Sequence, residues 1–371
     1  MELEGYIRNI TYQPHLTSRL KEVALDEFVP QSAPTYGLLK SETSSLAYSQ
    51  WVSPKRTRSY PFARMYQTYS SPKKITIIPI IKDEGADGDL DKIQYSTISW
   101  LNLLNIYLVL GYYDSAEKNS TSKQKHCHKL TRQRFHLPSI QEQIAQINNY
   151  HQSALHWNMN LCETRLATTL GKALTAYRDI AMQTRVTIHN QVGMQNYLKT
   201  IQKEYQQFRT LSLQGSQSAS QREIQTLHKQ EYLSEGDKAT IVIKNYLGGL
   251  YYLTVDEVIL EQNRLILQES KNATKGKLPS SADIRDGLFK LILYTNLDSL
   301  YHEKKKQNFV ARLRLTGKEI KGTCLLPHIT AVAEQKFIQE NALSKAQKIL
   351  LESLRKEAVS NNLEIEVVGN G

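Results

Sequence analysis

Cysteine is scarce in this chain of 371 residues, which contains only three. Cys127, Cys162 and Cys324 are too few and too far apart to form a disulfide framework or a four-ligand zinc site. Histidine does not complete such a site, because His126, His128 and His136 beside Cys127 lack zinc spacing. This usage is typical of a protein from a reducing compartment, so we expect a cytoplasmic location.

Long apolar runs and nucleotide-binding motifs are absent as well. The most apolar stretch, 100–113, contains Asn102 and Asn105 and is too short to span a bilayer. The first six residues are acidic and lack the apolar core of a signal peptide. Gly248-Gly249 is only a turn, so no glycine-rich loop indicates ATP dependence. We therefore expect no membrane and no nucleotide cofactor.

What the chain does have is an excess of basic residues. It carries 47 Lys and Arg against 36 Asp and Glu, for a net charge of +11. Such an excess favours a polyanionic partner, either nucleic acid or an anionic membrane. Charge alone is equally typical of a basic protein with no such partner, so its distribution matters more than the total.

The segment 254–271 is the most informative part of the sequence. Polar residues 261–264 separate two apolar runs and predict a β-hairpin. A two-residue turn at Gln262-Asn263 and a four-residue loop over 261–264 give the same register. Asp256 then lies directly opposite Glu269, with the Cβ atoms roughly 5 Å apart, and Lys271 lies on the same face. Two carboxylates so close repel each other unless a cation lies between them, which predicts a metal site. The alternative is a surface hairpin with exposed ion pairs of little energetic value.

The N-terminal part of the chain predicts α/β structure. Its first ~70 residues resemble loops and short elements. Strands are expected at 74–82 and 106–112, with a helix at 96–104 between them. Residues 114–136 are polar and basic and predict a loop, and apolar spacing predicts helices from 138 to about 207. A low-complexity stretch, 212–221, is the best candidate boundary.

Beyond that boundary the order of expected elements is α-β-β-β-α-β. The elements in question are a helix at 222–232, strands at 238–246, 250–260 and 265–271, a helix at 282–300 and a strand at 309–315. Helical sequence at 329–359 and an edge strand at 363–368 follow. The fold class is therefore mixed α/β, with a core of this order and helical and loop-rich N-terminal additions. The expected segments are 1–137, 138–211, 222–322 and 329–371.

At this point the sequence resembles the PD-(D/E)XK nuclease superfamily, and within it the type II restriction endonucleases. The family has an acid on its second core strand and an acid-x-Lys on its third, which Asp256, Glu269 and Lys271 match. The segments 277–288 and 75–91 also resemble stretches of such enzymes, although Val255 replaces the usual proline. The resemblance covers about 80 residues, 238–316. Three further copies of acid-x-Lys, at Glu303, Glu319 and Glu334, have no opposed acid.

The resemblance implies a Mg²⁺-dependent, sequence-specific endonuclease that cleaves double-stranded DNA as a homodimer. Asp256 and Glu269 would bind Mg²⁺, with the Ser270 carbonyl as a third oxygen, because hard cations prefer oxygen ligands. Lys271 would orient or activate the attacking water and stabilise the charge on the phosphate. An additional acid from the preceding helix, Glu223 or Glu231, could join the site.

Basic residues elsewhere are candidates for DNA contacts. Arg312 and Arg314 share one face of the strand at 309–315, and they would suit a DNA backbone or protect a sheet edge. Lys55, Arg56 and Arg58 lie in a segment in which cations alternate with aromatic residues, which suits phosphates and bases or a solvated loop. The acidic loop 83–91 resembles a calcium loop incompletely, and a solvated loop is the alternative.

Three functions follow from these observations. The first is a type II restriction enzyme, for which a DNA methyltransferase is the expected genetic neighbour. The second is a transposon-end or repair nuclease of the same superfamily that acts with partner proteins. The third is a non-catalytic nucleic-acid-binding protein, whose binding would be salt-sensitive and independent of Mg²⁺.

Overall fold

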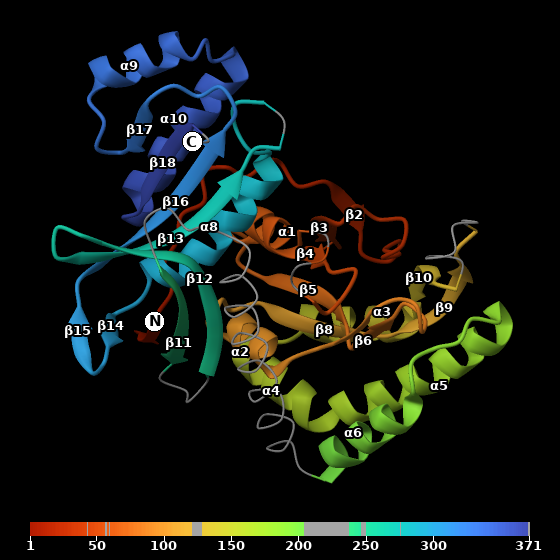
Figure 1. Cartoon of the computed structure of the whole chain (residues 1–371). Coiled ribbons are helices and arrows are strands. Elements are labelled where there is room, and N and C mark those ends of the chain that lie inside the picture. Colours follow the sequence, from red (N-terminus) through yellow and green to blue (C-terminus); the bar gives the residue numbers. More distant parts are fainter. Residues whose placement is uncertain are drawn as a thin grey trace. The chain divides into compact units, whose positions relative to one another are not determined.

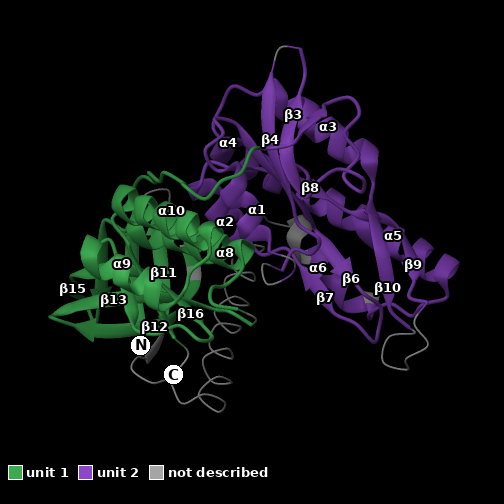
Figure 2. Cartoon of the chain, turned by 90° about the horizontal axis from the view of Figure 1, so that it is seen from above, with its two compact units in different colours: residues 1–19, 216–371 green, residues 20–215 purple. Residues whose placement is uncertain are grey.

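The chain forms two compact units, coloured separately in Figure 2. The computed structural model describes residues 1–42, 44–55, 58, 60–120, 128–203, 237–245, 250–274 and 276–369. Unit 1 comprises Met1–Arg19 and Ser216–Gly371, and unit 2 comprises Leu20–Gly215. These bounds differ from the segments expected from sequence, because the first 19 residues and the C-terminal region belong to unit 1. The boundary near 215 does fall within the low-complexity stretch.

Unit 1 is built on a nine-stranded mixed sheet (Figure 1). In spatial order its strands are β15 (Lys305–Gln307), β14 (Ser299–His302), β1 (Glu2–Ile7), β11 (Asp237–Asn245), β12 (Leu250–Glu261), β13 (Arg264–Asn272), β16 (Phe309–Gly317), β18 (Glu364–Gly369) and β17 (Thr323–Leu326). β11, β12 and β13 are antiparallel, and β16 pairs with β13 in parallel. Its helices are α8 (Ser281–Thr295), α9 (Ala331–Glu340) and α10 (Lys345–Asn361).

Helix α8 lies on the connection from β13 to β16 and packs against both strands. The Ser280 side chain caps it by accepting a hydrogen bond from the Asp283 N–H. One face of the helix is buried, and it includes Ile284, Leu288, Leu291 and Ile292, as the apolar spacing predicted. Gly287 allows a close approach, because a Cβ there would lie 2.7 Å from Leu313 Cδ1. The helix is therefore held directly over the sheet.

The hairpin of β12 and β13 confirms the predicted register. Its pairs run from Glu261 opposite Arg264 to Glu257 opposite Gln268, around a two-residue turn. Gln262 and Asn263 have φ values of 46° and 64°. Positive φ at both central residues is the geometry of a type I′ turn, whose twist matches that of the paired strands.

A β-bulge in β12 was not predicted. Asp237 and Ala239 of β11 pair with Val258 and Val255, so β12 has one residue more than its partner between these pairs. The bulge also shifts the spacing of these buried apolar residues. Leu253 and Val255, before it, are two residues apart, whereas Val258, after it, follows Val255 by three. A bulge redirects side chains. Here it brings Asp256 to the face of the sheet that α8 covers.

Other predictions for unit 1 need correction. The helix expected at 282–300 ends at Thr295, because the chain turns into the β14–β15 hairpin before β16. β18 was expected at a sheet edge, but it lies between β16 and β17. Within the described residues, the order from β11 to β16 contains two strands, β14 and β15, that the order expected from sequence lacks. The helix expected at 222–232, with Glu223 and Glu231, lies outside the described residues.

Unit 2 has a separate five-stranded mixed sheet (Figure 1). In spatial order its strands are β2 (Glu22–Ala24), β3 (Tyr36–Lys40), β4 (Ser45–Gln50), β5 (Lys74–Pro79) and β8 (Tyr107–Gly111). Its helices are α1 (Pro61–Thr68), α2 (Tyr95–Leu103), α3 (Leu137–Asn148), α4 (Ala154–Thr164), α5 (Leu166–Thr184) and α6 (Gln191–Lys203). The predicted strand–helix–strand unit is confirmed as β5, α2 and β8, with β5 and β8 parallel.

The loop expected at 114–136 was a wrong prediction. Most of its described part forms the antiparallel strands β9 (Tyr113–Lys118) and β10 (Leu130–Phe135). The alternation of apolar and charged residues in β10 is a strand pattern that its basic composition obscured. β6 (Ile81–Asp83) and β7 (Leu90–Lys92) form a further small hairpin. Among the helices of the described residues, none has the length and hydrophobicity needed to cross a bilayer.

The turn geometry leads to a prediction about stability. Replacing Gln262 by Asn should raise the free energy of unfolding of unit 1 by roughly 0.5 kcal/mol, because Asn tolerates positive φ better. Gln262→Val should lower it by about 1 kcal/mol or more, because a β-branched residue is strained there. Differential scanning calorimetry of the three proteins measures both changes. The opposite order of melting temperatures would contradict the turn assignment.

Candidate active site

Asp256 lies on β12 beside the bulge, with 38% of its side chain exposed. Its Oδ2 accepts a hydrogen bond from the Ser270 N–H at 3.1 Å. This contact follows directly after the last strand pair, Glu257 with Gln268. The carboxylate thus bridges the two strands of the hairpin and keeps Oδ1 on the side of α8, where Lys290 Nζ lies 3.8 Å away.

Glu269 is the most deeply buried charged group of the site, with 1% exposure. Lys290 Nζ lies 2.7 Å from its Oε2, and Lys271 Nζ lies 3.0 Å from its Oε1. A buried carboxylate is unfavourable unless it is paired. Each oxygen here has its own ammonium partner.

Lys271 is held between two carboxylates. Its Nζ lies 3.0 Å from Glu269 Oε1 and 2.8 Å from Asp286 Oδ2. Asp286 and Lys290 are four residues apart on α8, so they lie on the same side of the helix. The site therefore consists of Asp256, Glu269 and Lys271 from the hairpin and of Asp286 and Lys290 from α8.

Asp286 and Lys290 were not among the residues predicted for the site. Their spacing on a predicted helix was a usable signal, since an acid and a lysine four residues apart can face one partner. What the spacing did not show was the rotation of the helix over the sheet. The nearest candidates then considered, Glu223 and Glu231, lie outside the described residues.

The protonation of the site reflects its burial. Desolvation raises the pKa of Glu269 to about 7, although Lys290 and Lys271 favour its charged form. Burial alone would lower the pKa of Lys271, but the charges of Glu269 and Asp286 and the hydrogen bonds to them outweigh burial and raise it. Lys271 is therefore an ammonium at neutral pH and acts as a hydrogen-bond donor.

The arginines expected beside the acids lie on the other face of the sheet. Leu313 pairs with Glu269, so Arg312 and Arg314 point away from the site. Arg312 is 5% exposed and lies 2.6 Å from Glu364 and 3.1 Å from Glu261. Alternation correctly placed the two arginines on one face, but it did not reveal which face. A buried, paired guanidinium cannot serve as the DNA contact that we expected of Arg312.

Arg314 is ion-paired as well, with its Nε 3.2 Å from Glu366 of β18. The carboxylates of β18 therefore neutralise the basic face of β16, which the isolated strand pattern could not show.

The basic segment of unit 2 is partly neutralised within that unit. Arg58 forms ion pairs with Asp89 and Asp91, and the Ser53 hydroxyl donates to Asp91 at 2.7 Å. Lys55 is exposed, and Arg56 lies outside the described residues. The acidic loop 83–91 thus contains partners of Arg58, which gives at least two of its carboxylates a structural role.

Asp256 and Glu269 are chemically suited to a hard divalent cation. No cluster of three or more acidic, histidine or cysteine ligands occurs among the described residues. Mg²⁺ nevertheless needs only one or two protein carboxylates, because water and substrate phosphates supply its other ligands. The Ser270 carbonyl remains the expected third protein oxygen, and its N–H already binds Asp256. These residues therefore fit Mg²⁺, which would act there as a Lewis acid.

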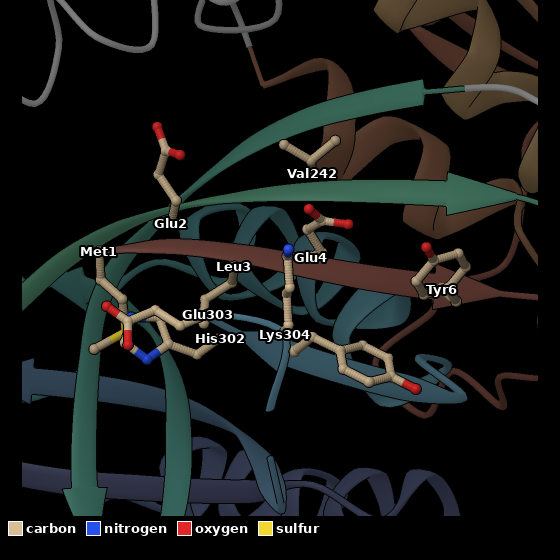
Figure 3. A pocket seen from close by; sticks show the side chains of 10 residues that line it. Met1, Glu2, Leu3, Glu4, Tyr6, Val242, His302, Glu303 and Lys304 are labelled. Carbon is tan, nitrogen blue, oxygen red and sulfur yellow. The ribbon is translucent and has the colours of Figure 1, made fainter. Parts of the chain in front are cut away.

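A separate hollow of about 830 Å³ lies in unit 1 along β1 and the β14–β15 hairpin (Figure 3). Among the side chains that line it are Glu2, Glu4, Tyr6, Tyr301 and His302. None of the five residues of the candidate site lines this hollow. It is therefore a different part of the sheet from the acidic pair.

Comparisons with family models, with curated proteins and with solved structures find no match for this chain.

The ion pairs of Glu269 lead to a second prediction. Lys290→Met should lower the free energy of unfolding of the metal-free protein by about 2–3 kcal/mol, because it leaves one buried oxygen without an ammonium. Adding Glu269→Gln should restore most of the loss, since the buried charge is then gone. Calorimetry in EDTA measures both changes. Lys318→Met, at an exposed lysine, is the control. Additive losses in the double variant would contradict the pairing.

Proposed function

We propose that this chain is a Mg²⁺-dependent endonuclease of the PD-(D/E)XK type that hydrolyses phosphodiester bonds in double-stranded DNA. One observation carries the proposal. Asp256 and Glu269 come from adjacent strands onto one face of a sheet, with the Lys271 ammonium 3.0 Å from Glu269. The connection of β13 to a parallel β16 through α8 supports it further.

Each residue of the site has a defined task in this proposal. Asp256 and Glu269 would hold Mg²⁺, which would neutralise negative charge at the phosphate. Lys271 donates hydrogen bonds to the attacking water and to the phosphoryl oxygens, on which negative charge builds up. Asp286 and Glu269 together fix the position of that ammonium. In this proposal the Lys271 ammonium, paired with Glu269 and Asp286, orients the attacking water.

The charge of the ionised site favours binding of a divalent cation. Asp256, Glu269 and Asp286 supply three negative charges, and Lys271 and Lys290 supply two positive charges, so the ionised cluster has a net charge of −1. A negative cluster repels a phosphodiester. A divalent cation held by the two acids offsets this negative charge, which favours the approach of the phosphodiester.

Exposed lysines of unit 1 are the best candidates for contacts with the DNA backbone. Lys304, Lys305 and Lys306 form the exposed tip of the β14–β15 hairpin, and Lys318 and Lys321 are exposed after β16. Such contacts fix the position of DNA without reading its sequence. They replace Arg312 in the proposal, and Lys55 of unit 2 remains a candidate. Cleavage of both strands at a specific site would use a homodimer, with a DNA methyltransferase as the genetic neighbour.

The proposal predicts a defined pattern of activity. Asp256→Asn, Glu269→Gln and Lys271→Ala should each reduce cleavage of plasmid and phage DNA in Mg²⁺ by roughly 100-fold or more, because each removes charge stabilisation from the reacting phosphate. EDTA should abolish cleavage. Gel electrophoresis of the digests measures the rates, and sequencing of the fragment ends gives the site.

Matched controls come from other acid-x-Lys copies of the chain. Glu319→Gln and Lys336→Ala change the same residue types at exposed positions and should leave cleavage unchanged. Equal cutting by wild type and all site variants would refute the proposal. Tight, salt-sensitive DNA binding without any cleavage would identify a non-catalytic binding protein instead. Cleavage that appears only with partner proteins would favour a transposon-end or repair nuclease.

A further inference from the structure

Lys290 has an unusual position relative to the two acids. Its Nζ lies 2.7 Å from Glu269 Oε2 and 3.8 Å from Asp256 Oδ1. Among the described residues it is the cation whose ion pairs reach both carboxylates, since Lys271 pairs with Glu269 and Asp286. Its side chain is 15% exposed and extends from α8, one turn after Asp286. The ammonium thus lies at the junction of the two strands and the helix.

This ammonium takes the electrostatic role of a metal ion. Two carboxylates on one face repel each other, and Glu269 is 1% exposed, so water screens its charge poorly. Lys271 cannot neutralise the pair alone, because Asp286 shares its charge. Lys290 supplies the remaining positive charge and offsets the repulsion between the two acids.

A divalent cation bound by the two acids would take oxygens of the same carboxylates. Oxygen ligands of Mg²⁺ lie about 2.1 Å from the ion, and Nζ lies 2.7 Å from Glu269 Oε2, so an ion on that oxygen would lie within about 5 Å of Nζ. A monovalent and a divalent cation at such a short separation repel each other strongly. The lysine stem is flexible, so its ammonium can move away while α8 stays in place.

We propose that Lys290 is a resident counter-cation of the acidic pair, which a divalent metal ion must displace. This displacement of Lys290 rests on the proposed function in one respect, which is that the metal ion is the Mg²⁺ that such a nuclease would use. Its consequence is regulatory: the ammonium holds the site assembled without metal, and it lowers the affinity of the site for the metal ion. Cleavage would then begin only at metal concentrations that overcome this competition.

The test measures metal binding without DNA and without activity. Mn²⁺ is titrated calorimetrically into the purified full-length chain, wild type and Lys290→Met, at neutral pH. The Met variant should bind one Mn²⁺ about 10-fold more tightly or better, because the competing charge is gone. Adding Asp256→Asn should abolish this gain, whereas Lys318→Met should bind like wild type. Lys290→Gln repeats the test with a polar side chain, in case the Met variant folds poorly.

Mn²⁺ should also raise the melting temperature of Lys290→Met more than that of wild type, because a ligand stabilises the state that it binds. Unchanged or weaker Mn²⁺ binding by both Lys290 variants would overturn the proposal, as would a gain that survives Asp256→Asn. The outcome is independent of the nuclease assay. Tighter Mn²⁺ binding by Lys290→Met, in a protein that cuts no DNA, would support the displacement of Lys290 and refute the nuclease function. Cleavage of DNA with unchanged Mn²⁺ affinity in the variant would support the nuclease function and refute the displacement.

Discussion

The carboxylate of Glu269, 1% exposed, is the group around which the face of unit 1 beneath α8 is organised. A charge buried to this degree has to be paired, because otherwise its desolvation would cost several kcal/mol. The two ammonium partners come from different elements, Lys271 from β13 and Lys290 from α8. Asp286 then binds Lys271 from the helix side. These ion pairs fix the position of α8 relative to β13. They also create the local charge pattern from which we infer phosphodiester chemistry.

The bulge in β12 is the second constraint. Regular alternation from Leu253 and Val255 would place Asp256 on the face opposite the one those residues share. The extra residue of β12 relative to β11 changes the phase, so Asp256 and Val258 face α8. The hydrogen bond from the Ser270 N–H then fixes the carboxylate. Bulges are frequent beside functional sites because they redirect a side chain without breaking the sheet, and that is their effect here.

The two faces of the central strands carry separate sets of charges. On the face away from α8, strand pairing places Glu257, Gln268, Arg312 and Glu364 in one row across four strands. The side chains of Glu257 and Gln268 are hydrogen-bonded to each other, as are those of Arg312 and Glu364. This row fixes the register of the neighbouring strands, because a shift by one residue would separate a buried charge from its partner. The basic pattern of β16 suggested a contact with DNA, but Arg312 of this strand is paired with Glu364 inside the row.

The sequence by itself determined what depends on neighbouring residues. The turn at Gln262-Asn263 and its flanking apolar runs gave the hairpin register, and with it the shared face of Asp256, Glu269 and Lys271. It also gave the strand–helix–strand unit of β5, α2 and β8. Only the tertiary structure decided which residues join these groups. Lys290 reaches Glu269 from 21 positions away, Arg312 reaches Glu364 from 52, and β1 pairs with β11 across most of the chain. The reason is physical: a local pattern states which side chains share a face, whereas their partners depend on which helix packs over that face and at what rotation.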